Sequence, residues 1–180
     1  HNDLQEGNIL YSDHLNSPVH VDFIDFEYTC YNYRGFDWGN HYCEHFISYS
    51  NPQWPHYTMK SSLLHCIESN STNNENESNV VENCIWKSKF HQIHHIDHFI
   101  LFLQAYFDRP LNAFEMELYL KEMLYSSLLS HFQWSVWSIL LAKSDIPFGY
   151  LEYAKDRMQE YYHMKEWLLK YLPLEEDLSQ

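Results

Sequence analysis

Apolar residues recur every three or four positions in the second half of the chain, beginning near residue 93. The positions that set this period are Ile96, Phe99, Ile100, Leu103 and Phe107. A period close to 3.6 residues predicts an amphipathic helix. Pro110 sets its end, because a proline inside a helix removes a hydrogen bond and clashes with the preceding turn.

Two further helices are expected after this proline. Asn112 and Glu115 have the spacing of a capping box, and the long apolar stretch that follows them predicts a helix to about Ala142. Residues 144–149 have the composition of a turn. The pattern then predicts a last amphipathic helix that ends near Leu172.

A β-hairpin and a shorter helix are expected in the first third of the chain. Residues 9–28 combine short apolar or alternating runs with turn-like residues over 13–18, which is typical of a hairpin. After a loop over 29–36, Asp37 can cap a helix that runs to about Tyr49. One hairpin followed by long helices predicts an α+β fold that is mainly α.

Residues 68–83 differ in composition from their surroundings. They consist largely of asparagine, serine and glutamate, and such polar segments bury too little apolar surface to fold. We therefore expect a solvated, disordered insertion there and assign it no function. The chain has no internal repeats, and its 180 residues suit one domain or a part of a larger protein.

The charge balance narrows the classes of partner. Lysine and arginine total 11 and aspartate and glutamate total 25, which gives a net charge of −14. Nucleic acid is excluded as a partner on this ground, because phosphate contacts need clustered cations. An acidic chain favours a cationic substrate, or a substrate that arrives with its metal ion.

Cysteine usage and hydropathy bear on the compartment. The four cysteines are Cys30, Cys43, Cys66 and Cys84. They form no CxxC pair and no disulfide-dense pattern, so a reducing compartment is expected and the prediction is a cytoplasmic protein. No stretch of the sequence approaches the length of a membrane span.

Asp3, Asn8 and Asp25 have the order and spacing of a kinase catalytic centre. In such a centre the first aspartate meets the substrate hydroxyl, and the asparagine and second aspartate hold Mg²⁺. Asp3 and Asn8 can face one cavity from opposite ends of a tight loop, and Asp25 can enter from a neighbouring strand end. Their oxygen atoms suit an ion that keeps most of its waters and shares nucleotide phosphates.

The nucleotide-clamping parts of a kinase are not evident in these 180 residues. The chain begins inside the catalytic loop without an initiator methionine, and with 4 glycines it has no glycine-rich loop. We expect the chain to be the C-terminal part of a longer protein. Residues 1–180 alone are therefore expected to show negligible ATP-dependent turnover.

Five ordered motifs resemble the choline/ethanolamine kinase family. They are His1-Asn2-Asp3 with Glu6-Gly7-Asn8, Ile24-Asp25-Phe26-Glu27-Tyr28, Tyr31 to Asp37 with Gly39-Asn40-His41, Ser130-His131-Phe132 with Trp134 and Trp137-Ser138, and Phe148-Gly149-Tyr150. The Glu6-Gly7 pair and Phe26 resemble the choline-kinase branch more than the ethanolamine branch. Trp38 departs from the family pattern, where an aliphatic residue is expected, and this affects packing only.

The resemblance implies a fold and an activity. The fold is the helical C-terminal lobe of a protein-kinase-like fold over residues 1–180, with a small β-hairpin carrying the catalytic loop. The activity is ATP-dependent phosphorylation of choline on the route to phosphatidylcholine. Asp3 is implied as base, Asn8 and Asp25 as Mg²⁺ ligands on the ATP phosphates, and Glu27 as a supporting acid. The full-length protein is expected to form a homodimer.

The same resemblance implies an aromatic substrate pocket. Its residues are Gln5, Tyr28, Tyr33, Glu44, Tyr49, Trp134, Trp137, Phe148 and Tyr153. Choline has no N–H, so aromatic faces must capture its charge, at roughly 0.5–2 kcal/mol for each well-placed ring. Trp134 and Trp137 are three residues apart on an expected helix, so both rings can project from one face.

Three alternatives remain open from the sequence. An ethanolamine kinase would want acidic or carbonyl acceptors for a primary ammonium, and an orphan lobe could bind quaternary amines without catalysis. An antibiotic-modifying phosphotransferase is the weaker alternative, because the paired tryptophans do not suit a heavily hydroxylated sugar amine.

A zinc site is a separate possibility. His91, His94 and His98 have helical ligand spacing for zinc, although we favour a polar helix start there.

Overall fold

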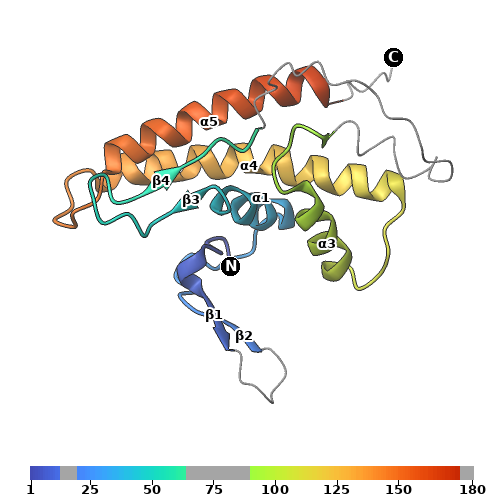
Figure 1. Cartoon of the computed structure of the whole chain (residues 1–180), viewed down its shortest axis with the longest axis horizontal. Helices are drawn as coiled ribbons and strands as arrows, with labels where there is room; N and C mark the ends of the chain where they lie inside the picture. Colours follow the sequence, from blue (N-terminus) through green and yellow to red (C-terminus); the bar gives the residue numbers. More distant parts are fainter. Residues whose placement is uncertain (13–19, 64–89, 175–180) are drawn as a thin grey trace, which may run out of the picture.

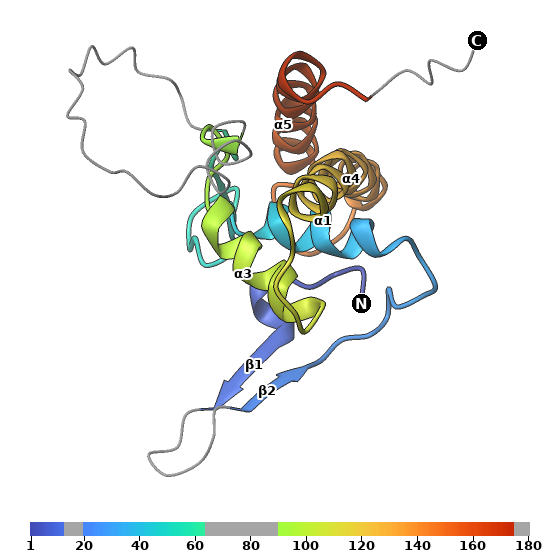
Figure 2. The ribbon, with the colours of Figure 1, turned by 90° about the vertical axis from the view of Figure 1, so that its right-hand side faces the viewer.

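The computed structural model describes residues 1–12, 20–63 and 90–174. Two long helices, α4 (Ala113–Leu141) and α5 (Tyr150–Tyr171), lie side by side along its longest dimension (Figure 1). Helix α1 (Arg34–Glu44) packs against α4, and α3 (Ile96–Tyr106) lies beside the start of α4 (Figures 1 and 2). The fold is α+β and mainly α, as the sequence predicts.

The helices expected from apolar periodicity are present. Helix α3 ends at Tyr106, before Pro110, and α4 begins at Ala113 behind the predicted capping box. The Asn112 side chain accepts a hydrogen bond from the Glu115 N–H (2.9 Å), and the Glu115 carboxylate accepts one from the Asn112 N–H (3.1 Å). These two bonds satisfy N–H groups that a helix start leaves without partners.

Two small antiparallel sheets complete the described fold. Strands β1 (Ile9–Ser12) and β2 (His20–Phe23) form the predicted hairpin, which projects from the helical body (Figure 1). The turn predicted over 13–18 lies outside the described residues. Strands β3 (Ile47–Ser48) and β4 (Thr58–Met59) form a second pair that apolar periodicity did not predict, because each strand has only two residues.

The expected helix from Asp37 to Tyr49 is wrong at both ends. Helix α1 begins at Arg34 with Tyr33 as its N-cap, and it ends at Glu44. Asp37 lies inside the first turn, where its Oδ1 accepts a hydrogen bond from the Asn2 N–H (2.8 Å). The chain leaves the helix after Glu44 because the following residues pair with β4.

Gly39 permits the close approach of α1 to α4. A Cβ atom at this position would lie 2.5 Å from the backbone nitrogen of Ser127. The main core lies among the helices that meet here, and its buried members include Trp38, Tyr42, Phe99, Leu103, Met116, Leu120, Met123, Leu124, Met164 and Leu168. This core holds the end of α1 in a fixed position relative to α4 and α5.

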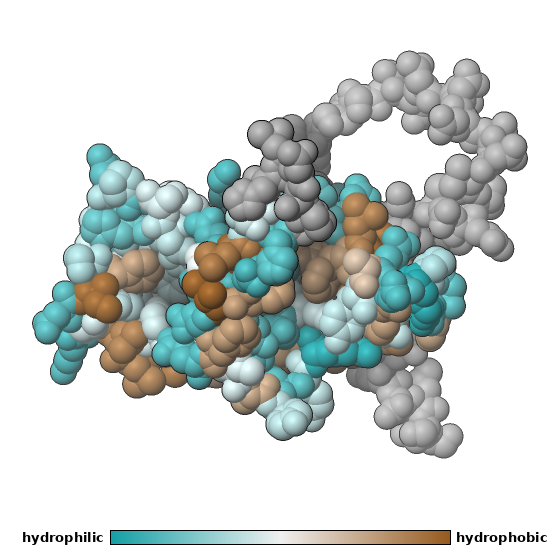
Figure 3. Space-filling view, turned by 90° about the horizontal axis from the view of Figure 1, so that it is seen from below, coloured by the Kyte–Doolittle hydropathy of each residue, from teal (hydrophilic) through white to brown (hydrophobic). Residues whose placement is uncertain are grey.

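Four further observations concern the surface, membrane spans, the polar insertion and the cysteines. Apolar groups alternate with polar ones on the face seen in Figure 3. None of the helices in the described ranges combines the length and hydropathy needed to cross a bilayer. The insertion expected over 68–83 lies outside the described residues, so its predicted disorder stays a prediction. Cys30 and Cys43 are free thiols.

Candidate functional site

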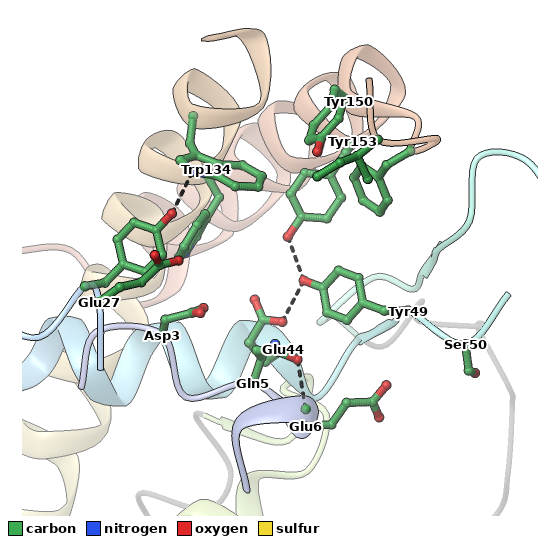
Figure 4. A pocket seen from close by; sticks show the side chains of 15 residues that line it. Asp3, Gln5, Glu6, Glu27, Glu44, Tyr49, Ser50, Trp134, Tyr150 and Tyr153 are labelled. Atoms are coloured by element: carbon green, nitrogen blue, oxygen red, sulfur yellow. Dashed lines mark hydrogen bonds between the residues drawn. The ribbon is translucent and has the colours of Figure 1, made fainter. Parts of the chain in front are cut away.

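A cavity of about 580 Å³ opens between the first eight residues, the end of α1, and helices α4 and α5. Its lining residues are Asp3, Gln5, Glu6, Gly7, Glu27, Tyr28, Glu44, Tyr49, Ser50, Trp134, Trp137, Ile146, Phe148, Tyr150 and Tyr153. In Figure 4, Asp3 lies next to the aromatic group around Trp134, and Tyr49 and Tyr153 stand on the other side of the cavity. The cavity thus combines carboxylates with rings on two sides.

The loop that carries Asp3 is closed by Asn8. The Asn8 Nδ2 group donates to the Asp3 carbonyl oxygen (2.8 Å) and to Asp3 Oδ2 (3.0 Å), and Asn8 is 4% exposed. A short 3-10 helix, Glu6–Asn8, returns the chain to Asp3, with Gln5 as its N-cap accepting from the Gly7 N–H (2.9 Å). This bracing fixes the Asp3 carboxylate relative to the cavity.

Asp25 is tied to the same loop through its neighbour. The Ile24 N–H donates to the Asn8 carbonyl oxygen (3.1 Å), and the Ile24 carbonyl lies 2.8 Å from His1 Nε2. Asp25 has a φ of 60°, a left-handed conformation that is uncommon for a residue with a side chain. The end of β2 is thereby held beside Asn8, with Asp25 exposed.

Asn2 anchors the loop to the start of α1. Its side-chain Nδ2 donates to the Tyr28 carbonyl oxygen (3.0 Å), and its Oδ1 accepts from Asn32 Nδ2 (3.1 Å). With a φ of 65°, Asn2 occupies a conformation that asparagine tolerates better than most residues. Together with the bond to Asp37, these contacts connect the loop of Asp3 to three parts of the chain.

A buried ion pair lies on the far side of the cavity. Arg157 Nη2 donates to Glu44 Oε1 (2.7 Å), and the two side chains are 0% and 5% exposed. The Tyr49 hydroxyl donates to Glu44 Oε2 and also meets the Tyr153 hydroxyl, both at 2.8 Å. Arg157 Nε donates to the Tyr153 hydroxyl (3.1 Å). Both oxygens of the Glu44 carboxylate therefore have partners.

The tryptophans of α4 form the opposite wall. Trp134 and Trp137 meet edge to face with ring centroids 5.3 Å apart, and Tyr28 packs edge-on against Trp134 at the same distance. The Trp137 indole N–H donates to the Tyr28 hydroxyl (2.9 Å), and the Trp134 indole N–H donates to Asn40 Oδ1 (2.7 Å). Because their N–H groups are bonded, the rings can present their faces to the cavity.

The cavity is electrostatically negative. Its described lining includes Asp3, Glu6, Glu27 and Glu44, and no lysine or arginine. Burial, with a further contribution from the Glu44 charge, raises the pKa of Asp3 from 3.8 to about 6, although the bond from Asn8 lowers it. Burial likewise raises the pKa of the Tyr49 hydroxyl. A cation that entered would relieve the repulsion among these carboxylates.

Most of the residues expected in the pocket lie together in the structure. The cavity is lined by Gln5, Tyr28, Glu44, Tyr49, Trp134, Trp137, Phe148 and Tyr153, together with Asp3 and Glu27. Tyr33 lies outside it as the 86% exposed N-cap of α1. Asn8 and Asp25 do not line the cavity. The catalytic and binding roles of these residues stay predictions.

Sequence reasoning missed some lining residues and the cation behind Glu44. Glu6, Gly7, Ser50, Ile146 and Tyr150 also line the cavity. Tyr150 belonged to a quoted motif and Ser50 follows Tyr49, so proximity in sequence was an available signal for both. For Arg157 the sequence offered one indication of a role at the pocket, namely that it lies one helical turn after the expected pocket residue Tyr153. Its pairing with Glu44 requires the packing of α5 against α4 and α1.

The donor atoms around Asn8 fit a hard cation. Because Asn8 Nδ2 is turned toward Asp3, the Oδ1 atom is the one available as an oxygen ligand. The Asp25 carboxylate supplies further oxygens at the adjoining strand end, and such ligands suit Mg²⁺. The predicted His91–His98 alternative finds no support, because none of the residues placed by the structure form a group of three or more metal-binding side chains.

Comparisons with known proteins agree with this geometry. The family profile described as choline/ethanolamine kinase matches residues 1–162. The chain is 37% identical to a choline/ethanolamine kinase of Mus musculus over 92% of its length, and 36% identical to one of Homo sapiens over 92%. It spans 37% of the length of each of these relatives.

A solved structure supports the fold. The crystal structure of a choline kinase from Cryptosporidium parvum superposes with a TM-score of 0.68 over 96% of this chain and 40% of the other, at 24% identity. At that identity the likeness bears on the fold alone. The family match over residues 1–162 is the finding that indicates common descent. On these findings, the chain belongs to the choline/ethanolamine kinase family.

Proposed function

We propose that this chain provides the amine-binding and metal-binding half of an enzyme that phosphorylates choline with ATP. The observation that carries the proposal is the cavity in which the Asp3 carboxylate faces a two-sided aromatic lining. A phosphoryl acceptor with a cationic head needs both features in one space. The family membership supports the reaction class, a phosphotransferase acting on an alcohol.

Asp3 is proposed to act on the substrate hydroxyl. Its carboxylate is held by the Asn8 side chain, so it can accept a hydrogen bond from a hydroxyl placed in the cavity. Phosphoryl transfer proceeds through a loose transition state, so the main contribution of Asp3 is to orient the hydroxyl oxygen and then accept its proton. Its pKa of about 6 lies near the range in which a general base works well.

Asn8 and Asp25 are proposed as ligands of Mg²⁺ on the ATP phosphates, with Glu27 as a supporting acid. The bound ion would supply charge neutralisation on the phosphates. The chain's own contribution is to hold the two ligands together through the Ile24 N–H bond to the Asn8 carbonyl. Asp25 keeps its carboxylate exposed at the strand end, where nucleotide phosphates can approach.

Choline is favoured over ethanolamine by the aromatic faces of the cavity. A primary ammonium needs oxygen atoms that can accept its N–H groups. The Glu44 oxygens accept from Arg157 and Tyr49, and the Gln5 side-chain carbonyl accepts from the Gly7 N–H. The Glu6 and Glu27 carboxylates also line the cavity, however, so acceptors alone do not separate the two amines. The aromatic faces carry no such bonds, and they attract a methylated ammonium without any hydrogen-bond donor.

The substrate assignment can be tested on residues 1–180 by calorimetric titration with choline and with ethanolamine. We expect choline to bind at least about tenfold more tightly, which corresponds to roughly one well-placed ring at 1.4 kcal/mol. Equal or tighter ethanolamine binding would overturn the choline assignment and favour an ethanolamine kinase. Choline binding with no turnover in the longer protein would favour a non-catalytic quaternary-amine-binding lobe.

Whether residues 1–180 can use ATP without further parts of the protein is tested separately. We infer that ATP binding depends on the part of the relatives that this chain does not match, so residues 1–180 alone are expected to give negligible phosphocholine. Mass spectrometry after incubation with choline, ATP and Mg²⁺ measures this. Robust phosphocholine production would contradict the inference while leaving the choline pocket in place. The homodimer and the cytoplasmic location stay predictions.

A further inference from the structure

One buried amide lies between α1 and the aromatic wall of α4. The Asn40 side chain is 0% exposed, and its Oδ1 atom accepts a hydrogen bond from the Trp134 indole N–H (2.7 Å) and another from the Ser130 hydroxyl (2.7 Å). Ser130 and Trp134 are four residues apart, so they lie on one face of α4. A single oxygen atom of α1 therefore holds two side chains of α4, and one of them, Trp134, lines the cavity.

The indole determines how this amide is oriented. An indole N–H can only donate, so the group that faces it has to be the amide oxygen and not the NH₂ group. The Asn40 Nδ2 atom is then buried without a hydrogen-bond partner among the residues that the structure places, which is unfavourable. A leucine has a similar size and shape and would leave no polar group unsatisfied. What asparagine adds at this position is the acceptor for the Trp134 N–H.

The bond to Asn40 fixes more than one ring. Trp134 is 6% exposed, and its ring meets the rings of Trp137 and Tyr28 edge to face, in each case with centroids 5.3 Å apart. Torsions at an aromatic ring have broad energy minima, so a hydrogen bond at the ring edge is what selects one orientation of its plane. A change in the plane of Trp134 would therefore displace both neighbouring rings of the cavity wall.

The same face of α1 also holds the opposite wall. Glu44 lies four residues after Asn40 and accepts from the Tyr49 hydroxyl (2.8 Å). Asn40 and Glu44 thus each orient one side of the aromatic lining. A ring attracts a cation when the cation lies over its face, within about 6 Å of the centroid. A tilt of either wall is therefore expected to change the affinity of the cavity for an ammonium ion.

We propose that Asn40 is a positioning residue of the amine site and acts through the Trp134 indole. Asn40 does not line the cavity, so it does not touch the substrate itself. Its Oδ1 atom holds the Trp134 ring in the plane that presents a face to the cavity, and the Trp137 and Tyr28 rings follow. This role rests on the proposed function, because it assigns Asn40 to the binding of the same amine.

Calorimetric titration of residues 1–180 with choline tests the role of Asn40. Asn40→Leu removes the acceptor at similar volume and should weaken choline binding by about 2- to 30-fold, the range expected for one aromatic face. Asn40→Asp keeps an oxygen at the same place and should lose no more than about twofold. Circular dichroism checks that each variant is folded.

Ser130→Ala is the matched control. It removes the other hydrogen bond to Asn40 Oδ1 and leaves the bond from Trp134 in place. Its choline affinity should stay within about twofold of the wild type. The control therefore separates loss of the indole bond from a general disturbance of the contact between α1 and α4.

The Trp134→Phe background gives a readout that a purely structural role would not move. Phenylalanine keeps a ring but has no N–H to donate, so adding Asn40→Leu to Trp134→Phe should weaken choline binding by less than about twofold further. In the chain without amine, the indole ¹H–¹⁵N resonance of Trp134 should move upfield in Asn40→Leu and stay close to its wild-type position in Ser130→Ala.

The outcomes distinguish this role from the proposed function. Wild-type choline affinity in a folded Asn40→Leu chain would overturn the role of Asn40 and leave the choline pocket in place. A full further loss in the Trp134→Phe background would do the same, because the effect would then not pass through the indole N–H. A wild-type chain that binds no choline would instead overturn the proposed function, and this role with it.

Discussion

Arg157 Nη2 lies 2.7 Å from Glu44 Oε1, and both side chains are withdrawn from solvent. The guanidinium also donates to the Tyr153 hydroxyl and contacts His131 Nδ1. This pair connects α5 to the end of α1 directly behind the aromatic cavity. It fixes the Glu44 carboxylate and, through that carboxylate, the Tyr49 ring that lines the cavity.

Replacing Arg157 by methionine should destabilise the fold strongly. The change leaves the buried Glu44 carboxylate without its cation, and breaking a buried pair on one side costs about 3–5 kcal/mol. Urea unfolding followed by circular dichroism measures this cost. Arg34→Met is the comparison and should cost less, because the Arg34–Glu122 pair is 44% and 31% exposed, although this change also removes the guanidinium from over the Trp38 and Tyr119 rings.

Removing both charges should recover part of that loss. In Glu44→Gln combined with Arg157→Met, no uncompensated charge remains, so the double variant should be more stable than Arg157→Met alone. If the double variant lost as much unfolding free energy as the two single variants together, packing of the arginine, and not the ion pair, would dominate at this position.

Trp137→Leu should weaken choline binding by about 2- to 30-fold, the range expected for one aromatic face over a quaternary ammonium. Trp137 is half-buried and lines the cavity, so its replacement removes a ring with limited effect on the core. Calorimetric titration of residues 1–180 measures the change. Trp137→Phe keeps a ring and should lose less. An equal loss in both variants would indicate that the indole N–H bond to Tyr28 matters, and not the aromatic face.

Local spacing in the sequence was enough to predict the loop of Asp3 and the long helices. Asp3 and Asn8 contact one another across five residues, so their relation depends on one short turn of chain. The capping box of α4 is equally local, since Asn112 and Glu115 bond within three residues. Features of this kind are determined by neighbouring residues and can be recognised without knowing the tertiary packing.

Features that depend on packing could not be predicted in the same way. Helix α1 ends at Glu44 because Ile47, a few residues later, pairs with Met59. The polar–apolar pattern of the sequence continues past Glu44 without a break, so it gives no sign of this pairing. The partner of Glu44 lies 113 positions away at Arg157. An arginine on an amphipathic helix is ordinarily expected at the surface, so only the meeting of α1, α4 and α5 identifies this one as buried.

Gly39→Ala should destabilise the α1–α4 contact. The new Cβ would meet the backbone of α4, 2.5 Å from Ser127 N and 2.7 Å from Ser126 C, so the helices must separate. Overpacking of this kind costs about 1–3 kcal/mol. Thermal unfolding measures the effect. Gly7→Ala is the control, because its Cβ would meet only the flexible Gln5 side chain at 3.1 Å, and it should change the melting temperature less.

Stability should fall on acidification through His131. Burial, with a smaller contribution from the Arg157 charge, holds the pKa of His131 well below its usual range in the folded chain. Because the unfolded value is near 6.5, only the unfolded chain binds this proton between the two pKa values, and protonation then favours unfolding. This residue should remove at most about 1.4 kcal/mol of stability between pH 7.5 and 5.5, the limit reached when only the unfolded chain titrates in this window.

The contribution of His131 can be isolated by comparing pH slopes. His131→Gln should lower stability at pH 7.5, because it disturbs the contacts of the ring with Arg157 and Cys43. It should nevertheless lose less stability than the wild type on going to pH 5.5. His163→Gln makes the same substitution at a side chain that is 50% exposed and serves as the comparison for a histidine-to-glutamine change outside the core. If His131→Gln keeps the full wild-type slope under urea unfolding at both pH values, a different group must carry the acid sensitivity.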